Sequence, residues 1–259
     1  MSAPKPRVGL VLGASGPRSV GWAIAQQLAS DGAEVAITAR PARCEGLRDA
    51  SDEAGFAGLW GVDAAQPETL DACLAELDRR WGRLDFLVHT WMQIPAGVLS
   101  QPLRDVRRED FDLAMGAGVF GFVSAASRAQ PMLARSAAPR VVTLTSACRR
   151  RMTPRYHLAG IAKAALDGAL IYVAQELGEH GIACNAVSFS LIATPGAEKV
   201  VGVDAAASTS AWLAKKAPLK GGVDGEAVAG AVAWLCSPMA RGITAETIEV
   251  DGGFSKRYL

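Results

Sequence analysis

The sequence predicts an α/β fold: a single domain with a doubly wound parallel sheet and helices on both faces. Short apolar runs rich in branched residues, the pattern of buried strands, alternate along the chain with longer amphipathic stretches typical of helices. That alternation predicts a parallel sheet covered on both sides. No linker and no internal repeat divides the 259 residues, and a chain of this length can form one large core. We therefore expect residues 1–259 to form one domain.

The expected elements follow in order along the chain. Strands are expected at residues 8–12, 34–39, 59–62, 84–89, 140–145, 182–187 and 247–250. Helices are expected at about 22–30, 42–54, 67–81, 109–133 (interrupted around Gly116 and Gly118) and 226–236, and a long alanine-rich helix carries Lys163 and continues to Leu177. Residues 188–222 form a long mixed segment with an amphipathic piece near 211–216. Because such loops are usually lids or binding segments, we expect a substrate lid at about 189–222.

Composition excludes several classes of function. A net charge of +1 gives no electrostatic reason for binding nucleic acid or an anionic membrane. The five cysteines are scattered, with no CxxC pair and no histidine cluster near them, which is typical of reduced thiols and predicts no metal site. The first seven residues are polar, unlike a signal peptide, and we find no apolar window of about 20 residues. We therefore expect a cytoplasmic protein.

A glycine-rich turn joins the first expected strand to the first expected helix. Gly13, Gly16 and Gly21 stand at this turn. Small residues there let the backbone approach a pyrophosphate, and the free N–H groups of the following helix favour an anion. The turn is not a strict GxGxxG. It nevertheless indicates a dinucleotide-binding, Rossmann-type domain.

The end of the second strand indicates which dinucleotide is preferred. NAD-binding folds place an acidic residue there to hold the ribose hydroxyls, but this chain has Arg40, with Arg43 close by and no carboxylate between Val35 and Cys44. A guanidinium at this place suits a 2′-phosphate. We therefore expect NADPH, with NADH as the second candidate. The alternative is that both arginines only start a solvated helix.

Three side chains after the fifth strand can carry out proton chemistry: Ser146, Tyr156 and Lys163. The tyrosine and the lysine are seven residues apart, which on a helix is about two turns with almost no angular offset. A lysine ammonium close to a tyrosine favours the phenolate, so we expect the pKa of Tyr156 to be lowered toward a value useful for acid–base catalysis. The alternative is a surface lysine and a half-buried tyrosine.

Five stretches carry a resemblance over nearly the whole chain: GASGPRSVGWAIA at 13–25, LVHT at 87–90, the Tyr156-x6-Lys163 pair, NAVS at 185–188 and VDGGF at 250–254. With these motifs the chain resembles the short-chain dehydrogenase/reductase family, and within it the branch of bacterial enoyl-acyl-carrier-protein reductases. The ordinary branch has Tyr-x3-Lys, but Ala159 stands four residues before Lys163. The enoyl reductase branch has Tyr-x6-Lys and a longer glycine turn with a serine near its end, here Ser19.

The resemblance implies hydride transfer from a nicotinamide to the β-carbon of an α,β-unsaturated thioester. Tyr156 would stabilise the enolate oxygen, and Lys163 would bind the nicotinamide ribose and add positive charge. Thr194 would meet the pyrophosphate, and Asp63 the adenine amino group. The implied catalytic set is Tyr156, Lys163 and Ser146, and the implied cofactor-binding set is Gly13, Ser19, Val20, Arg40, Asp63, Thr90, Lys163, Ile192 and Thr194.

Three departures from the branch fall in the expected pocket. Ser146 stands where most enoyl reductases have a second tyrosine, Trp91-Met92 replaces a small segment ending in glycine, and Ser190-Leu191 replaces Pro-Gly. They predict a reshaped pocket for a specialised, bulky or cyclic substrate. Reduction of an enoyl group and reduction of a ketone both stay open. The alternatives are a non-redox cyclase, isomerase or dehydratase with Tyr156 as acid–base, and a silent binding protein, which the intact Tyr–Lys pair argues against.

Two further expectations concern charge and assembly. The basic run at 149–151 is expected to be a solvated loop, with binding of the phosphates of an acyl-carrier arm or of coenzyme A as its alternative. The three histidines (His89, His157 and His180) are expected to be structural or exposed. The small residues of the helix from Ala162 to Leu177, together with the resemblance, predict pairing across a two-fold axis and a homotetramer.

Overall fold

The structure is a computed structural model, which describes residues 6–153 and 155–257. Its centre is a seven-stranded sheet in which every strand pairs in parallel, in the order β3-β2-β1-β4-β5-β6-β7. The strands are β1 (Val8–Leu12), β2 (Glu34–Ala39), β3 (Gly58–Gly61), β4 (Phe86–His89), β5 (Arg140–Thr145), β6 (Ala183–Phe189) and β7 (Thr247–Val250). This confirms the predicted fold class. The order reverses at β1, between β2 and β4, where ligands of doubly wound sheets bind.

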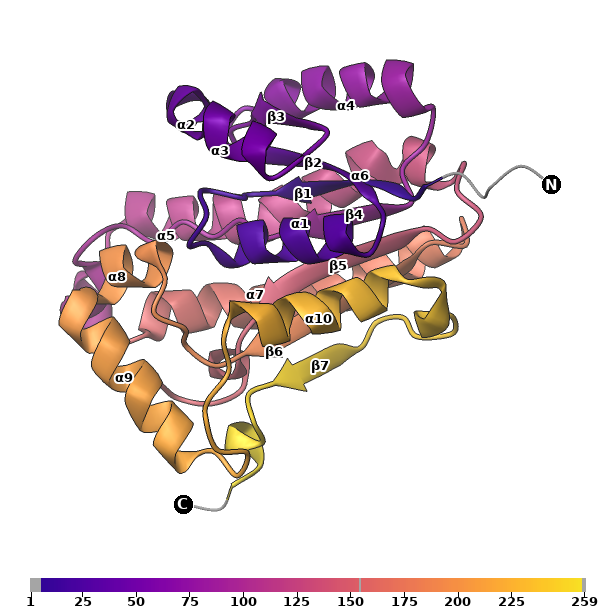
Figure 1. Ribbon diagram of the computed structural model, residues 1–259. Helices are drawn as coiled ribbons and strands as arrows, with labels where there is room; N and C mark the ends of the chain where they lie inside the picture. Colours follow the sequence, from indigo (N-terminus) through magenta and orange to yellow (C-terminus); the bar gives the residue numbers. More distant parts are fainter. Residues whose placement is uncertain (1–5, 154, 258–259) are drawn as a thin grey trace.

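Helices cover both faces of the sheet (Figure 1). On one face α4 (Pro67–Trp81), α6 (Gly121–Leu133) and α7 (His157–Gly178) bury leucines, alanines and Phe122 against the strands. On the other face α1 (Val20–Ser30) and α10 (Gly225–Cys236) enclose a second apolar core with Trp22. Both layers keep the sheet rigid, so its carboxyl edge is a fixed platform for side chains.

The helix expected at 42–54 is not continuous. It consists of α2 (Pro41–Cys44), a 3-10 turn at Glu45–Leu47, and α3 (Arg48–Glu53). Gly46 lies in the break and is exposed, and glycine is a poor helix former. Only Ser51 of α2 and α3 is buried, so packing does not compensate, and the prediction of one helix was wrong.

The interruption expected around Gly116 and Gly118 is a π-helical turn. Helix α5 (Arg108–Met115) runs through the turn Gly116–Phe120 into α6 without leaving helical geometry. π-turns are rare and frequently occur beside functional sites. This one lies where the sequence predicts a break, although the chain stays helical through it.

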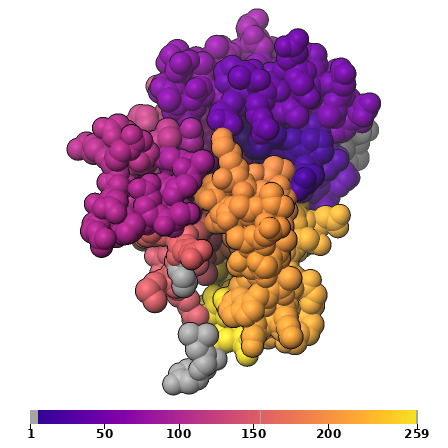
Figure 2. Space-filling view, turned by 90° about the vertical axis from the view of Figure 1, so that its left-hand side faces the viewer, coloured from indigo at the N-terminus to yellow at the C-terminus, as the bar shows by residue number. Residues whose placement is uncertain are grey.

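Residues 189–222 contain more helix than the sequence indicates. Helix α8 (Pro195–Val201) and helix α9 (Val203–Lys216) replace the mixed segment with a short amphipathic piece. Helix α9 buries only Ala206, so its apolar periodicity is weak and its start escaped sequence analysis. In the space-filling view, this orange segment runs from the middle of the face downward, beside the magenta residues and below the indigo amino-terminal part (Figure 2).

Helix α7 is long and apolar enough, by length and composition alone, to cross a membrane, which the sequence analysis did not anticipate. In the structure its apolar residues Leu166, Leu170, Val173 and Leu177 are buried in the core beneath the sheet. A core helix of this kind passes the same test of length and hydropathy.

Candidate active site

The glycine turn after β1 is packed so closely that only glycine fits. Gly13 has φ +94°, and a Cβ on it would lie 2.6 Å from Thr90 Oγ1 and 2.9 Å from Trp91 Cδ1. A Cβ on Gly21 would lie 3.0 Å from the carbonyl oxygen of Gly13. Thr90 Oγ1 donates to the Leu12 carbonyl at 2.7 Å, so the ends of β1 and β4 are joined here. The turn is a cradle of bare backbone at the point where the strand order reverses.

A cavity of about 530 Å³ lies between α1, α10 and the segment after β6, and Pro17 and Arg18 of the glycine turn reach it. Four residues of the implied cofactor set line it: Ser19 and Val20 from the start of α1, and Ile192 and Thr194 from the segment after β6. Ser19 caps α1, accepting from the Trp22 N–H at 3.2 Å and donating to the Gly16 carbonyl at 2.8 Å. Bare glycine backbone and the free N–H groups of a helix start fit the pyrophosphate of a dinucleotide.

An ion pair joins the glycine turn to α8. Arg18, which lines the cavity, pairs with Glu198 in α8, so the segment after β6 touches the expected phosphate site. Thr194 caps α8 by accepting from the Ala197 N–H at 3.3 Å. Neither Arg18 nor Glu198 was predicted. Both lie in segments singled out by the sequence, but their pairing depends on the tertiary fold.

The residues expected near the adenine ribose follow β2 and β3. Arg40 is exposed immediately after β2 and precedes α2. Arg43 donates to the Ser15 carbonyl at 3.2 Å, so a guanidinium does reach the glycine turn. Asp63 is tied into its own turn, where its carboxylate accepts from the Ala65 N–H at 3.0 Å. The structure places all three at one end of the carboxyl edge.

Tyr156 and Lys163 do not stack on one helix as expected. Helix α7 begins at His157, and Tyr156 precedes it with φ −140° and ψ 20°. Burial, and next to it the Cys148 thiol, raise the pKa of Tyr156 to about 12. The expectation of a lowered tyrosine pKa is therefore wrong for the protein without a bound cofactor, because loss of solvent disfavours the charged phenolate.

Lys163 is half-buried at the end of β5. Its ammonium donates to the Leu144 carbonyl at 2.7 Å. Burial lowers the pKa of Lys163 to about 8, while the neighbouring Cys148 acts in the opposite direction. His89, on β4, is buried and shares a hydrogen bond of 2.9 Å between its Nδ1 and Thr143 Oγ1. Burial, and then the charge of Lys163, lower the pKa of His89 to about 3, so its imidazole is neutral.

Sequence analysis missed Cys148. Its thiol lies 2.7 Å from the hydroxyl of Ser146, and its charge state influences both Tyr156 and Lys163. Burial raises the pKa of Cys148, so the thiol stays protonated at neutral pH. The signal in the sequence that could have found Cys148 was its position two residues after Ser146.

The side chains of Trp91 and Met92 pack in two different places. Trp91 packs against the glycine turn and Gly121, and its ring meets that of His89 edge-on at 5.6 Å. Met92 instead packs against a small apolar cluster that includes Leu158 and Ala159 and that also supports Tyr156 and the α8 valines. The methionine therefore shares one apolar cluster with the tyrosine and with α8.

Arg149 is not part of a solvated loop. Its side chain is only 4% exposed and forms ion pairs with Asp167 and Glu249. Arg149 is therefore already engaged and offers no free charge to a phosphate. The expectation fits Arg150 better, since its side chain is 70% exposed.

Comparison with known proteins shows the family. A family model described as "Enoyl-(Acyl carrier protein) reductase" matches residues 13–255. The chain belongs to the enoyl-(acyl carrier protein) reductase family. Within this family, the chain is 32% identical over 250 residues to enoyl-[acyl-carrier-protein] reductase [NADH] 1 of Rhizobium meliloti (strain 1021), covering 95% of this chain and 89% of that protein. It is 33% identical over 248 residues to the corresponding reductase of Haemophilus influenzae, covering 95% and 93%.

A solved structure of the family superposes over the whole domain. The Bacillus cereus enoyl-acyl carrier protein reductase with NADP⁺ and indole naphthyridinone gives a TM-score of 0.92 at 28% identity, covering 98% of both chains. The family relationship therefore extends through the sheet, the glycine turn and the segment after β6.

Proposed function

We propose that the protein is a nicotinamide-dependent reductase of enoyl substrates. One observation carries the proposal: the ammonium of Lys163 is held on the Leu144 carbonyl at the end of β5, and Cys148, in the turn after that strand, influences the pKa of both Lys163 and Tyr156, on the sheet edge that also bears the bare glycine cradle. A nucleotide site and a proton donor on one edge suit hydride transfer to a carbonyl-conjugated substrate. A non-redox cyclase, isomerase or dehydratase would not need the nucleotide site that the glycine turn forms.

Tyr156 and Lys163 have different proposed roles in the reaction. A bound reduced nicotinamide supplies the hydride for the β-carbon of the substrate. With its pKa at about 12, Tyr156 is protonated at neutral pH and can donate to the oxygen that becomes an enolate. Such a donor acts on charge that develops in the transition state, where it is worth most. Lys163 would hold the nicotinamide ribose and add positive charge beside the tyrosine.

The preferred cofactor is proposed to be NADPH. Arg40 and Arg43 follow β2, without a carboxylate to bind ribose hydroxyls, and Arg43 reaches the glycine turn. The Rhizobium and Haemophilus relatives are named for NADH, whereas the Bacillus structure contains NADP⁺. Calorimetric titration with NADPH and NADH tests the preference, and tighter binding of NADH would overturn it.

The substrate is proposed to be bulky or cyclic, presented as an enone or an acyl thioester. Ser146 leaves room where a tyrosine ring would stand, and its hydroxyl faces Cys148 rather than filling the pocket. Met92 packs against the same apolar cluster as Tyr156, and its flexible side chain can adjust to a large ligand. A short linear crotonyl thioester would make few contacts in such a pocket.

The experiment compares crotonyl thioesters with cyclic enones and ketones under saturating cofactor. We expect reduction of at least one cyclic enone, with a higher kcat/KM than for the crotonyl thioester. Preferential turnover of a ketone would change the assignment to carbonyl reduction. Binding of neither cofactor would overturn the redox proposal.

The first prediction is that Tyr156→Phe lowers kcat by about 10²–10³ because it removes the donor to the oxyanion. Cofactor affinity should stay within experimental error, since the phenyl ring retains the packing. Calorimetry on the same preparation measures that affinity. A variant that kept near-normal kcat would remove Tyr156 from the catalytic set.

A further inference from the structure

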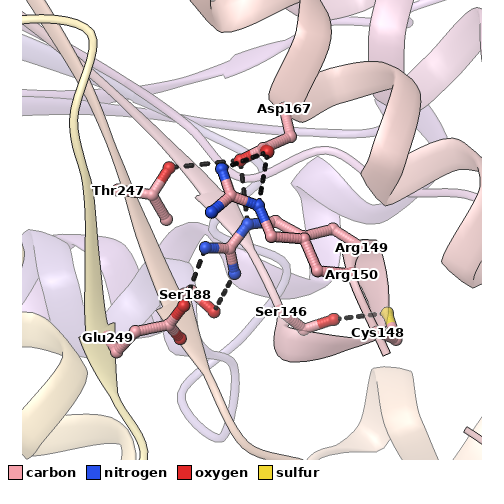
Figure 3. A network of polar contacts seen from close by, with 8 residues as sticks. All are labelled: Ser146, Cys148, Arg149, Arg150, Asp167, Ser188, Thr247 and Glu249. Carbon is pink, nitrogen blue, oxygen red and sulfur yellow. Dashed lines mark hydrogen bonds and ion pairs between the residues drawn. The ribbon is translucent and has the colours of Figure 1, made fainter. Parts of the chain in front are cut away.

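A polar network surrounds Arg149, next to the Ser146–Cys148 contact (Figure 3). Its centre is Arg149, in the 3-10 turn Ala147–Arg149 that follows β5. The guanidinium donates in three directions, to Asp167 Oδ1 at 2.8 Å, to Ser188 Oγ at 3.0 Å and to Glu249 Oε1 at 2.7 Å. These partners come from α7, β6 and β7. One side chain therefore ties the turn to three separate elements.

The network is built for rigidity rather than for net stability. Burying a guanidinium costs desolvation, and the cost is offset only when geometry and hydrogen bonding are good. Asp167 is held from further sides, because it also accepts from Arg150 at 3.1 Å and from Thr247 at 3.3 Å. In the described part of the chain, Glu249 Oε2 is buried without a hydrogen-bond partner. The network therefore holds Arg149 in one position although the burial of its charged groups costs desolvation free energy.

The turn held by Arg149 carries Cys148 and follows Ser146, a residue of the catalytic set implied by the resemblance. Asp167 stands one helical turn beyond Lys163 on α7, four residues later. Lys163 itself holds the Leu144 carbonyl, just before the turn. The same helix therefore grips the chain on both sides of Ser146, once through Lys163 and once through Asp167.

We propose that Arg149 is a positioning residue, which fixes the Ser146–Cys148 turn against α7 and so sets the distance of that turn from Tyr156 and Lys163. It does so through Asp167, Ser188 and Glu249, without contact with the reacting atoms. The effect of Arg149 on kcat rests on the proposed reductase function. Its effect on the position of the Ser146–Cys148 turn does not rest on that function.

The test that is independent of activity uses alkylation of Cys148 by iodoacetamide, followed by peptide mass spectrometry on the full chain. Cys44, also half-buried but located after β2, is the internal reference. In Arg149→Lys, which keeps the charge but loses the planar fork, local opening should raise the rate at Cys148 by about tenfold. The rate at Cys44 should stay unchanged.

The matched control is Arg150→Lys, because Arg150 shares the partner Asp167 but lies on the surface. Exposed pairs contribute little, so the rate at Cys148 should stay the same in that variant. If Arg149→Lys fails to fold, Asp167→Asn removes one carboxylate from the network and should raise the rate at Cys148 in the same direction. Equal acceleration at Cys44 and Cys148, or no acceleration in either variant, would overturn the proposal.

The kinetic arm measures an active enone at saturating cofactor. Arg149→Lys should lower kcat by about tenfold while the dissociation constant of the cofactor stays unchanged. Faster labelling of Cys148 with an unaltered kcat would overturn the link to catalysis. A wild-type protein without reductase activity would overturn the proposed function instead, and the labelling experiment would still decide the role of Arg149.

Discussion

Lys163 and Tyr156 have pKa values displaced in opposite directions by one cause. Burial lowers the pKa of the ammonium to about 8 and raises that of the phenol to about 12, because it disfavours the charged form of each. At neutral pH the pair is therefore an ammonium beside a neutral phenol. That is the protonation state required of a ribose ligand and an oxyanion donor.

The lysine predicts how cofactor affinity depends on pH. Lys163 is protonated below its pKa of about 8 and loses its charge as the pH rises through that value, so the interaction with the cofactor is present at neutral pH and lost in alkali. The dissociation constant should rise above pH 8, by at most about tenfold per pH unit for one linked proton. Calorimetry across the neutral to alkaline range measures it. A constant that is flat through this range would contradict the assignment of Lys163 to the cofactor.

Arg40→Asp should move cofactor preference from NADPH toward NADH. The substitution replaces a partner for the 2′-phosphate with an acceptor for the ribose hydroxyls. The ratio of the two dissociation constants is the readout, and Arg104→Asp, a second exposed arginine away from β2, serves as control. If the ratio is unaltered while both cofactors bind, Arg43 becomes the candidate.

Single residues were predictable where a motif fixes them in sequence. The glycine turn, Ser146, Tyr156 and Lys163 could be named in advance because their spacing is local. Cys148 and Arg149 gain their roles from partners far away in the chain, such as Glu249. The direction of the tyrosine pKa depends on burial, which spacing alone does not give.

At the scale of elements, α8 and α9 are loosely packed parts of the candidate site, since α8 buries no residue and α9 buries one. They are attached at both ends, by the Arg18–Glu198 pair near the glycine turn and by Trp212, whose ring meets that of Phe254 edge-on at 5.5 Å. Between these points α9 buries one residue, Ala206. Elements with so little buried apolar surface are the ones that open locally.

Trp212→Ala should therefore loosen α9 without unfolding the domain. Aromatic pairs contribute about 0.5–1.5 kcal/mol beyond their buried area, and Trp212 is 49% exposed, so the loss of global stability should be small. We expect faster hydrogen exchange over 203–216 and a raised KM for the substrate, with cofactor affinity unchanged. If residues 203–216 exchange at the same rate in the wild-type protein and in Trp212→Ala, the pair of rings is not what holds α9.

Strands and long helices were predictable to within a few residues because their apolar faces meet a core. The sheet and α4 follow the expected boundaries for this reason. Helices α2, α3 and α9 lie on the surface, where few buried positions mark their limits. Sequence periodicity therefore predicted the sheet and its core helices better than the surface helices α2, α3 and α9.

At the scale of the whole molecule, α7 leaves an apolar surface uncovered. Ile171 is 57% exposed and Tyr172 is 77% exposed, although the opposite side of the same helix is buried beneath the sheet. Large exposed side chains on a helix of small residues suit packing against a symmetry-related copy. The homotetramer expected from the sequence stays a prediction.

Light scattering should give a mass well above the 27.0 kDa of one chain, and Tyr172→Asp should lower it by placing a charge in the apolar contact. Circular dichroism checks that the fold is retained. The exposed Met239 on the 3-10 turn after α10 offers a comparison site, changed to aspartate. A monomeric wild-type protein at micromolar concentration would exclude the assembly.

The position of Trp91 gives the protein a built-in optical sensor. Its indole lies against the glycine cradle, within van der Waals reach of the backbone that would receive a dinucleotide. A reduced nicotinamide absorbs where tryptophan emits, so excitation energy absorbed by Trp91 can pass to a bound cofactor and quench its emission. Occupancy of the cradle can then be followed in real time without any label, and Trp91→Phe separates this emission from that of the other five tryptophans.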